Sequence, residues 1–344
     1  MEHNSQEGKQ LGRVVITGVA GFLGSHLADK FLAEGWEVVG VDNFIGGYED
    51  NIPEGVEFYE RDLTELDLEE EFWQSDLLIH AAALAYEGLS VFSPALISKN
   101  IIQSSVNLAT IAVKHNIHRF VYLSSMARYG DHNGQMFFED FTLKPQDPYG
   151  IAKASSEQLI RNILDTHGVD WTIIVPHNII GSRQKYDDPY RNVASIFVNR
   201  MLSGKQPIIY GDGLQQRCFS FVGDVVEPLY KATQIEESVG EVINVGPDKG
   251  TVTIAQLAEA IAEKLEFDLE PIYMTGRPQE VPIATCSAEK ARELLGYEAK
   301  TNLSDGLDEL IAYIKNRGAK PFEYHLPLEI VNERTPATWN NKLM

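Results

Sequence analysis

Short runs of Val, Ile and Leu alternate with longer stretches of helical periodicity through the first half of this chain. A brief run that is apolar throughout is typical of a strand buried on both faces of a sheet. The pattern predicts strands at residues 13–17, 37–42, 56–59, 76–80, 118–124 and 171–175, and helices at 25–34, 94–115 and 149–167. Strands that alternate with helices predict an α/β fold, a Rossmann-type doubly wound parallel sheet with right-handed crossovers.

After Pro176 the elements become shorter and more mixed. Thr253 is expected to cap the helix that follows it. The pattern predicts helices at 190–202, 253–265, 287–295 and 304–314, strands at 207–210, 217–221 and 271–274, and a strand at 242–245 that returns to the main sheet. We therefore expect a smaller C-terminal α+β lid over the edge of the sheet.

Four segments follow from this pattern: a flexible N-terminal tail at 1–12, a sheet domain at 13–178 with returning segments near 217–246, a lid domain at 179–316, and a C-terminal extension at 317–344. The last stretch, from residue 321 on, is too polar and too often broken by proline for a helix of any length. It is expected to wrap the surface or to pair with a partner subunit. Trp339 argues mildly against a disordered tail.

Composition narrows the function classes. The net charge of −21 argues against non-specific binding to nucleic acid or to an anionic membrane. No apolar run is long enough to span a bilayer, and the polar N-terminus is not a signal peptide. The two cysteines, Cys218 and Cys286, form no disulfide framework and have no metal-ligand spacing, so no metal is expected. Together these features indicate the cytoplasm.

A glycine-rich turn connects the first strand to the first helix. Gly18, Gly21 and Gly24 have the spacing G-x-x-G-x-x-G inside a strand–helix–strand unit, with Phe22 and Leu23 between them. Glycines here allow a tight turn, close backbone approach to a pyrophosphate, and close packing of helix on strand. Asp42 ends the second strand, where a carboxylate accepts hydrogen bonds from a ribose diol and repels a 2′-phosphate. No Arg or Lys lies in 43–52, so the sequence favours NAD over NADP.

Several polar or small residues follow the predicted strands directly. Parallel strands end at one edge of a sheet, and ligands of such folds bind beyond the carboxyl ends. We expect one site to gather the residues at these positions, which are Gly18, Asp42, Ala81, Ser125 and Asn178.

Tyr149 and Lys153 are four residues apart at the start of a predicted helix. This spacing places both side chains on one face, one turn apart. A nearby ammonium lowers the pKa of a phenol and lets it act as a base. Alone the pattern is weak, since on many amphipathic helices the tyrosine is half buried and the lysine snorkels.

An ordered series of motifs resembles the extended short-chain dehydrogenase/reductase superfamily, and within it the NAD-dependent nucleotide-sugar epimerase/dehydratase family. The resemblance covers residues 13–316. Within this family, the sequence resembles the UDP-sugar 4-epimerases. It rests on T-G-V-A-G-F-L-G (17–24), Asp42, H-A-A-A (80–83), S-S-M-A-R-Y-G (124–130), Y-G-I-A-K (149–153), P-H-N-I-I-G-S-R-Q (176–184), Y-G-D-G-x-x-x-R-C-F (210–219) and R-P-Q-E-V-P (277–282).

The resemblance implies a role for each matching residue. Tyr149 is the acid/base, Lys153 binds the nicotinamide ribose and lowers the pKa of Tyr149, and Ser125 hydrogen-bonds the reacting hydroxyl, with Ser124 as its competitor. The NAD contacts would be Gly18, Gly21, Phe22, Leu23, Gly24, Asp42, Asn43, Asp62, Leu63, Ala81, Ala82, Ala83, Asn100, Tyr149 and Lys153. The nucleotide sugar would meet Ser125, Met126, Asn178, Asn192, Tyr210, Arg217, Arg277 and Glu280.

The two arginines of this set, Arg217 and Arg277, are assigned to the diphosphate of the nucleotide sugar, because a guanidinium fork matches phosphate oxygens. The alternative for each is a surface salt bridge.

Departures from the family pattern limit the chemistry. Dehydratases that act at C4 and C6 carry Asp-Glu after the catalytic hydroxyl, and sugar-acid decarboxylases carry Glu at the second of these places. Met126 and Ala127 stand there, and neither transfers a proton. Glu280 replaces a more usual aspartate that holds a ribose. The two cysteines are interpreted as structural, and His177 as a packing or substrate contact.

The leading hypothesis is an NAD-dependent epimerase that inverts C4 of a nucleotide-diphosphate sugar through a transient 4-keto intermediate. The alternative is a 4-dehydrogenase or ketoreductase that performs half of this cycle. A 4,6-dehydratase and a non-catalytic nucleotide-binding regulator are weaker alternatives, the latter because a regulator has no need of Ser125, Tyr149 and Lys153 together. The resemblance also implies a homodimer formed through the helices at 93–115 and 149–167.

Overall fold

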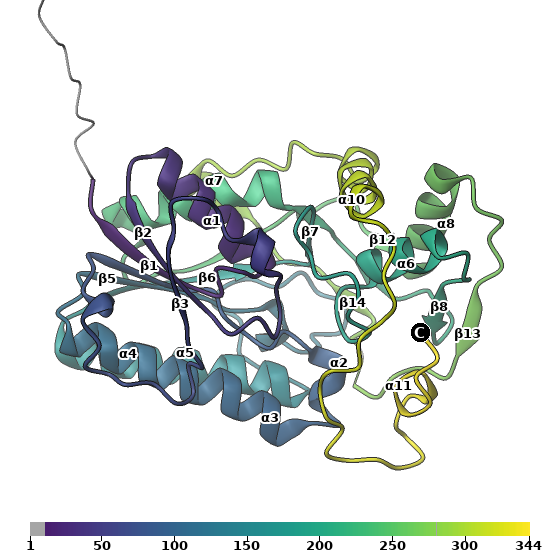
Figure 1. The fold of residues 1–344 in the computed structure, drawn as a ribbon, viewed down its shortest axis with the longest axis horizontal. Helices are drawn as coiled ribbons and strands as arrows, with labels where there is room; N and C mark the ends of the chain where they lie inside the picture. Colours follow the sequence, from purple (N-terminus) through teal and green to yellow (C-terminus); the bar gives the residue numbers. More distant parts are fainter. Residues whose placement is uncertain (1–10, 280) are drawn as a thin grey trace, which may run out of the picture.

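The computed structural model describes residues 11–279 and 281–344. Its centre is a sheet of seven strands in the order β11-β6-β5-β4-β1-β2-β3, and every neighbouring pair is parallel (Figure 1). The strands are β1 (Arg13–Thr17), β2 (Glu37–Asp42), β3 (Glu57–Glu60), β4 (Leu77–His80), β5 (Arg119–Leu123), β6 (Asp170–Pro176) and β11 (Val242–Val245). The predicted Rossmann-type sheet is confirmed, including the return of β11 to its edge.

Six of the seven strands are buried on both faces, as their largely apolar sequences predicted, whereas the edge strand β3 is only partly buried. In β1, Val14 and Ile16 pack into the core on one side of the sheet, and Val15 packs into the core on the other. This alternation follows from the pleat, which points successive side chains to opposite faces. Each face therefore needs a covering layer of helices.

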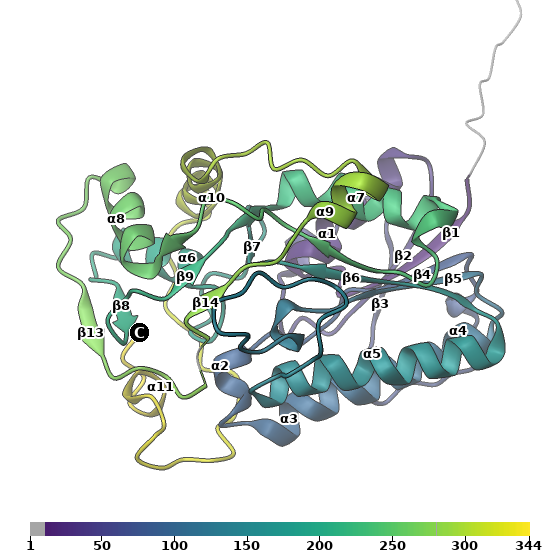
Figure 2. The same ribbon diagram turned by 180° about the vertical axis from the view of Figure 1, so that it is seen from behind.

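Two helical layers cover the sheet. On one face lie α1 (Phe22–Ala33), α7 (Val222–Gln234) and α9 (Glu289–Leu295), and on the other lie α3 (Pro94–Ser98), α4 (Ser104–Lys114) and α5 (Pro148–His167) (Figure 2). The short α2 (Glu87–Ser90) lies near the start of α5. The helices and the sheet enclose two continuous apolar cores.

The lid has a core of its own, built by α6 (Val193–Leu202), α8 (Ile254–Leu265) and α10 (Leu303–Arg317). Thr253 caps α8 in a complete capping box with Gln256, as expected for the first of these residues. The short strands pair as β7 (Ile179–Ile180) with β10 (Ser220–Phe221), β8 (Ile208–Tyr210) with β13 (Ile272–Met274), and β9 (Gln216–Arg217) with both β12 (Val252–Thr253) and β14 (Ile283–Ala284).

Several elements differ from the prediction. Helix α7 was not predicted, because Gly223 and Pro228 interrupt its pattern, yet it packs beside α1. The single helix expected at 94–115 is divided into α3, a π-helical turn (Lys99–Gln103) and α4. The strand expected at 217–221 is two strands, β9 and β10, and the helix expected from residue 190 begins at Val193 as α6.

The C-terminal stretch wraps the surface, one of its two expected arrangements, but it is not free of helix. It runs from the end of α10 past α2 to a short helix, α11 (Ala337–Asn340), beside β8 (Figure 1). Trp339 is only 3% exposed. We call residues 318–344 the C-terminal strap.

Candidate active site

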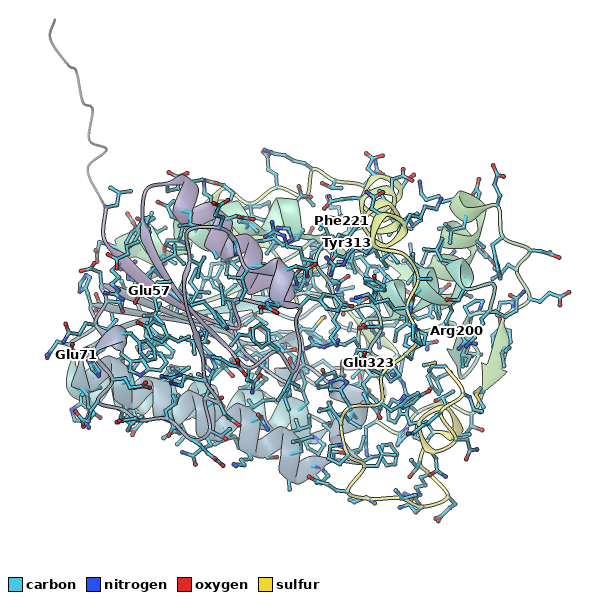
Figure 3. All side chains as sticks on the ribbon, in the orientation of Figure 1. Glu57, Glu71, Arg200, Phe221, Tyr313 and Glu323 are labelled. Atoms are coloured by element: carbon cyan, nitrogen blue, oxygen red, sulfur yellow. The ribbon has the colours of Figure 1, made fainter. Side chains whose placement is uncertain are left out.

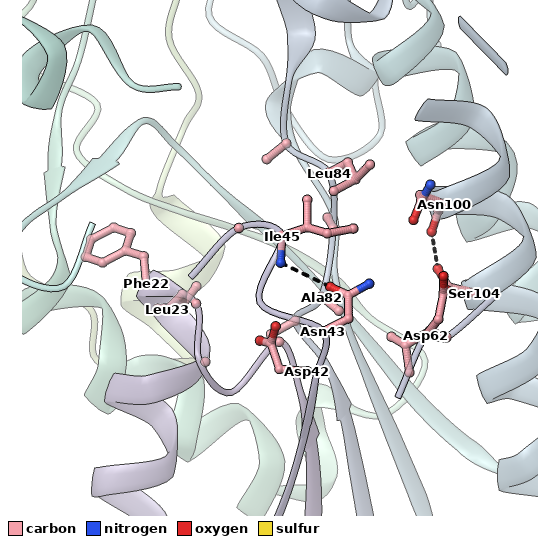
Figure 4. A pocket seen from close by; sticks show the side chains of 18 of the residues that line it. Phe22, Leu23, Asp42, Asn43, Ile45, Asp62, Ala82, Leu84, Asn100 and Ser104 are labelled. Atoms are coloured by element: carbon pink, nitrogen blue, oxygen red, sulfur yellow. Dashed lines mark hydrogen bonds between the residues drawn. The ribbon is translucent and has the colours of Figure 1, made fainter. Parts of the chain in front are cut away.

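One cavity at the carboxyl ends of β1, β2, β3 and β4 gathers the predicted cofactor residues of these strand ends and of the helices beside them. Figure 4 shows Phe22 and Leu23 on one side and Asn100 and Ser104 on the other. The predicted residues in its wall are Gly18, Gly21, Phe22, Leu23, Gly24, Asp42, Asn43, Asp62, Leu63, Ala81, Ala82, Ala83 and Asn100. We call this the cofactor cavity.

Glycine is required at two positions of the turn. Gly18 has φ of +77°, and a Cβ there would come within 2.8 Å of the Ala82 backbone. A Cβ on Gly24 would lie 2.1 Å from the Gly18 carbonyl oxygen, so this residue lets α1 pack closely on the turn. The first turn of α1 lies in the cavity wall, and the N-terminus of a helix favours a phosphate.

Asp42 holds the turn from the end of β2. Its carboxylate accepts hydrogen bonds from the backbone N–H groups of Ala20 (3.0 Å) and Phe44 (2.7 Å). Burial raises its pKa, and these bonds oppose the shift. Beside it, Asn43 accepts from the N–H of Ile45 at 3.3 Å (Figure 4). The carboxylate lies at the rim of the cavity, in the place that suits a ribose diol.

The far wall is the π-helical turn that contains Asn100. The Ser104 hydroxyl donates to the Asn100 carbonyl, and the Ser105 hydroxyl donates to the Ile101 carbonyl at 2.7 Å. These bonds compete with the α-helical ladder and explain the break in the helix. A glycine cradle, a helix N-terminus and an acidic group at the next strand end together fit a dinucleotide.

A second cavity of about 400 Å³ adjoins the first and contains the predicted catalytic residues Ser125, Tyr149 and Lys153. Phe22, Leu23 and Ala81 belong to the walls of both cavities. The predicted substrate residues in its wall are Ser125, Asn178, Asn192, Tyr210, Arg217 and Arg277. We call this the substrate cavity.

Tyr149 lies in the first turn of α5, where Asp147 is the N-cap and accepts from the Gly150 N–H at 2.9 Å. Burial raises the pKa of Tyr149 to about 12, and the hydrogen bond with the Ser125 hydroxyl opposes that shift. Arg191 also lowers this pKa through its charge. In the structure, Ser125 and Arg191 lower the pKa of Tyr149, whereas the family resemblance implies that Lys153 lowers it.

Lys153 is buried one helical turn after Tyr149. Its ammonium donates to the Leu123 carbonyl at 2.8 Å and lies 4.7 Å from the centre of the Tyr122 ring. Burial lowers the pKa of Lys153 to about 7, and the charge of Glu157 opposes that shift. Burial thus disfavours the charged forms of both Tyr149 and Lys153.

A buried ion pair lies behind these residues. Glu157 forms a salt bridge with Arg128 at 2.8 Å, and both side chains are almost completely buried. Glu157 also accepts a hydrogen bond from the Ser124 hydroxyl. The Ser124 hydroxyl is therefore occupied by Glu157, whereas the Ser125 hydroxyl is hydrogen-bonded to Tyr149. This difference favours Ser125 over Ser124 as the serine that meets the reacting hydroxyl.

The predicted substrate residues differ in how they are held. Asn178 donates to the Cys218 carbonyl at 3.1 Å, and Asn192 caps α6 through the Ala194 N–H at 2.9 Å. The Arg277 guanidinium lies 4.9 Å from the centre of the Tyr210 ring.

One predicted substrate contact, Met126, stands apart from this group. Met126 packs, partly buried, against the core under α4 and α5 instead of in the cavity wall, because it begins a 3₁₀ turn that points it inward. Glu280 lies outside the described residues.

Sequence reasoning missed two arginines in the cofactor cavity, Arg61 and Arg191. Arg61 pairs with Glu70 at 2.6 Å, and Arg191 lies 3.7 Å from Asp188 and 4.6 Å from the centre of the Tyr86 ring. Arg191 belongs to both cavity walls. No spacing pattern marks either residue, since each is a single arginine in a loop.

His177 and the cysteines are buried. Burial lowers the pKa of His177 to about 4, so its ring is neutral at pH 7. Burial raises the pKa of Cys218 to about 11. Burial also raises the pKa of Cys286. Both thiols stay protonated, which agrees with the structural role expected for them. Among the described residues, no cluster of His, Cys, Asp and Glu could hold a metal ion.

The profile of the NAD dependent epimerase/dehydratase family matches residues 14–246. The chain belongs to this family. A putative UDP-glucose 4-epimerase from Methanocaldococcus jannaschii is 32% identical over 308 residues, which are 88% of this chain and 98% of that protein. No helix in the described parts of this family member is long and apolar enough to cross a membrane.

Solved structures of the family are also similar. A UDP-glucose 4-epimerase from Thermotoga maritima, solved with UDP-glucose, has a TM-score of 0.81 at 32% identity and covers 89% of this chain and 99% of its own. A UDP-glucuronic acid 4-epimerase from Bacillus cereus, in complex with UDP-glucuronic acid and NAD, has a TM-score of 0.83 at 27% identity. The match covers 89% of this chain and 100% of that chain.

Proposed function

We propose that this protein inverts the configuration at C4 of a UDP-linked hexose, with NAD as its cofactor. The observation that carries the proposal is the position of Ser125, Tyr149 and Lys153 in a cavity that adjoins the cofactor cavity. The similar proteins bear the names of UDP-sugar 4-epimerases, and this supports UDP as the nucleotide.

The residues divide the reaction between them. NAD, when bound, supplies the acceptor and donor of the C4 hydride and a positive charge that favours the phenolate. Tyr149 removes the proton of the C4 hydroxyl, and Ser125 hydrogen-bonds the same oxygen. After the 4-keto sugar has turned to present its other face, Tyr149 returns the proton. Lys153 holds the nicotinamide ribose and stabilises the phenolate when it is charged.

The neighbours of Ser125 restrict the outcome. Elimination at C6 requires an acid and a base beside the catalytic hydroxyl, and Met126 and Ala127 can serve as neither. Hydride removal and return at C4 needs only Ser125, Tyr149 and Lys153. Epimerisation is therefore favoured over dehydration.

A panel of UDP-glucose, UDP-N-acetylglucosamine and UDP-glucuronate tests the proposal. We expect NMR to show inversion at C4 without net NADH in the near-ultraviolet. Stoichiometric NADH would instead support the 4-dehydrogenase. Tyr149→Phe should lower kcat by roughly 10²- to 10⁴-fold and leave NAD affinity unchanged, because it removes only the proton-transfer group. Substantial turnover by that variant would contradict the mechanism.

The protein is also proposed to be a homodimer, formed through α4 and α5. These helices lie side by side on one face of the sheet (Figure 2). Ile151 and Leu159 of α5 are 49% and 39% exposed, and they share one helix face with Ser155. An exposed apolar stripe on a long helix supports a subunit interface.

A further inference from the structure

The C-terminal strap, residues 318–344, lies beyond the segment that the family profile matches. The two structures described above cover 89% of this chain although 99% and 100% of their own chains are covered. About a tenth of this chain therefore lies outside each of these two matches. The strap nevertheless contributes to the wall of the substrate cavity through Met344.

The far part of the strap is fixed to the lid. The Arg200 guanidinium donates to the Leu343 carbonyl at 3.3 Å, and the Lys205 ammonium donates to the backbone oxygen of Met344 at 3.3 Å. The Met344 N–H donates to the Tyr324 hydroxyl at 2.9 Å. The Met344 side chain joins the lid core and is 9% exposed. Contacts of both the backbone and the side chain of Met344 therefore fix its position.

The part of the strap that forms α11 is fixed to residues 189 and 190 through Trp339. The Trp339 indole donates to the Pro189 carbonyl at 3.3 Å, and its ring centre lies 5.3 Å from that of Tyr190. Trp339 and Tyr149 belong to the same apolar cluster. Farther back, the Glu329 carboxylate accepts from the first N–H groups of α3. The strap thus contacts the sheet domain at α3 and the lid at Arg200 and Lys205, and Met344 lines the substrate cavity.

A polar contact joins the strap to a wall residue of the cavity. The hydroxyl groups of Tyr210 and Thr338 are hydrogen-bonded to each other. The face of the same tyrosine ring carries the Arg277 guanidinium, 4.9 Å from its centre. The strap therefore orients two side chains of the cavity wall that it does not itself supply.

The position of Met344 indicates which part of a ligand it meets. Tyr149 at the sheet edge fixes the place of the sugar C4, and the rest of a nucleotide sugar must extend from there into the lid. The chain ends beside β8 and β13, on the lid side of the molecule (Figure 1). Arg200, which holds this end, lies at the opposite end of the molecule from Glu57 and Glu71 (Figure 3).

We infer that the C-terminal strap forms the wall around the nucleotide end of the substrate cavity, with Met344 as a specificity-determining contact. The inference rests on the proposed function for the identity of the ligand. It makes the strap a binding element that acts on the nucleotide, remote from the atoms that react.

Met344→Ala tests the inference, with Leu343→Ala as its matched control because the neighbouring Leu343 side chain is 48% exposed. Titration calorimetry with UDP on the NAD-loaded protein should show a Kd for UDP on the order of 10-fold higher for Met344→Ala only. The KM for the best UDP-sugar should rise by a similar factor with kcat within about twofold, since lost uniform binding raises KM alone. NAD affinity and circular dichroism verify that the variant is folded.

The outcomes separate this inference from the proposed function. If the wild-type protein binds no UDP and inverts no sugar, the proposed function fails. If the wild-type protein is an active epimerase and Met344→Ala matches Leu343→Ala in Kd and KM, the inference is wrong. A higher KM with unchanged UDP affinity would place the contact at the sugar and would also overturn it. Removal of residues 336–344 should raise the Kd for UDP further, whereas an unchanged value would contradict the role of the strap.

Discussion

At the residue scale, the two titratable groups of the proposed mechanism are shifted in opposite directions by the same cause. Burial raises the pKa of Tyr149 to about 12 and lowers that of Lys153 to about 7. Both shifts favour the uncharged side chain. Ionisation of the phenol therefore depends on positive charge brought close to it, and in the proposed mechanism the bound cofactor brings that charge.

The buried lysine makes stability depend on pH. The pKa of Lys153 falls from 10.5 in the unfolded chain to about 7 in the fold. Unfolding therefore takes up a proton between these pH values, and this group lowers the free energy of unfolding most below pH 7 and least above pH 10. Lys153→Met removes the effect. At pH 6 we expect Lys153→Met to have a higher free energy of unfolding than the wild type. This difference between variant and wild type should be larger at pH 6 than at pH 10 by roughly 3 to 5 kcal/mol.

Urea unfolding across this pH range measures the difference. Lys99→Met is the control, because the Lys99 side chain is 56% exposed. The control should follow the pH dependence of the wild type. Parallel pH profiles of the wild type and Lys153→Met would show that the lysine is charged in the fold and would contradict the assigned pKa.

At the element scale, the start of α5 places Tyr149, the proposed acid/base. Asp147 accepts from the Gly150 N–H at 2.9 Å and from the Ser90 hydroxyl at 3.3 Å, so it fixes the first turn of the helix. Asp147→Ala removes the cap and should lower the free energy of unfolding by about 1 kcal/mol. Tyr149 lies in the turn that loosens, so kcat should also fall several-fold. Urea unfolding and initial rates measure the two effects.

Asp147→Asn separates the cap from the charge. Asparagine is as good an N-cap as aspartate and retains the acceptor oxygen. It should therefore keep most of the stability and most of kcat. If Asp147→Asn lost as much activity as Asp147→Ala, the carboxylate charge rather than the cap would be what the site requires.

The elements show what sequence patterns can predict. The seven strands of the sheet and helix α5 follow from short apolar runs and from helical periodicity, because burial on both faces or on one stripe leaves a direct trace in the sequence. The cofactor cavity follows as well, since its residues lie at strand ends that the topology brings together.

Other features depend on long-range packing and have no local signal. Helix α7 contains Gly223 and Pro228, and its packing against α1, α9, β10 and β6 offsets their poor helix propensity. Arg191 reaches both cavities from a loop whose path the lid decides. The strap reads as an irregular tail, and only Trp339 indicated that it has a buried partner.

At the scale of the whole molecule, the helical layer of α4 and α5 differs from the rest of the surface. The strap and lid cover the catalytic end of the sheet, while Ile151 and Leu159 remain exposed on α5. Ile102, Val106 and Val113 of the neighbouring helical segment are only partly buried. A two-fold axis through this face would pack the helices of two subunits as an isologous interface.

Leu159→Glu should therefore convert the proposed dimer to a monomer, because it places an unpaired charge in the apolar stripe at the proposed interface. Light scattering after size exclusion measures the mass. Leu214→Glu is the control, since Leu214 is 63% exposed in a lid loop away from α5. The control should keep the mass of the wild type, and Leu159→Glu should bind NAD with unchanged affinity because the residue is remote from the cofactor cavity. A wild type of monomer mass, or a dimer that survives Leu159→Glu, would contradict this interface.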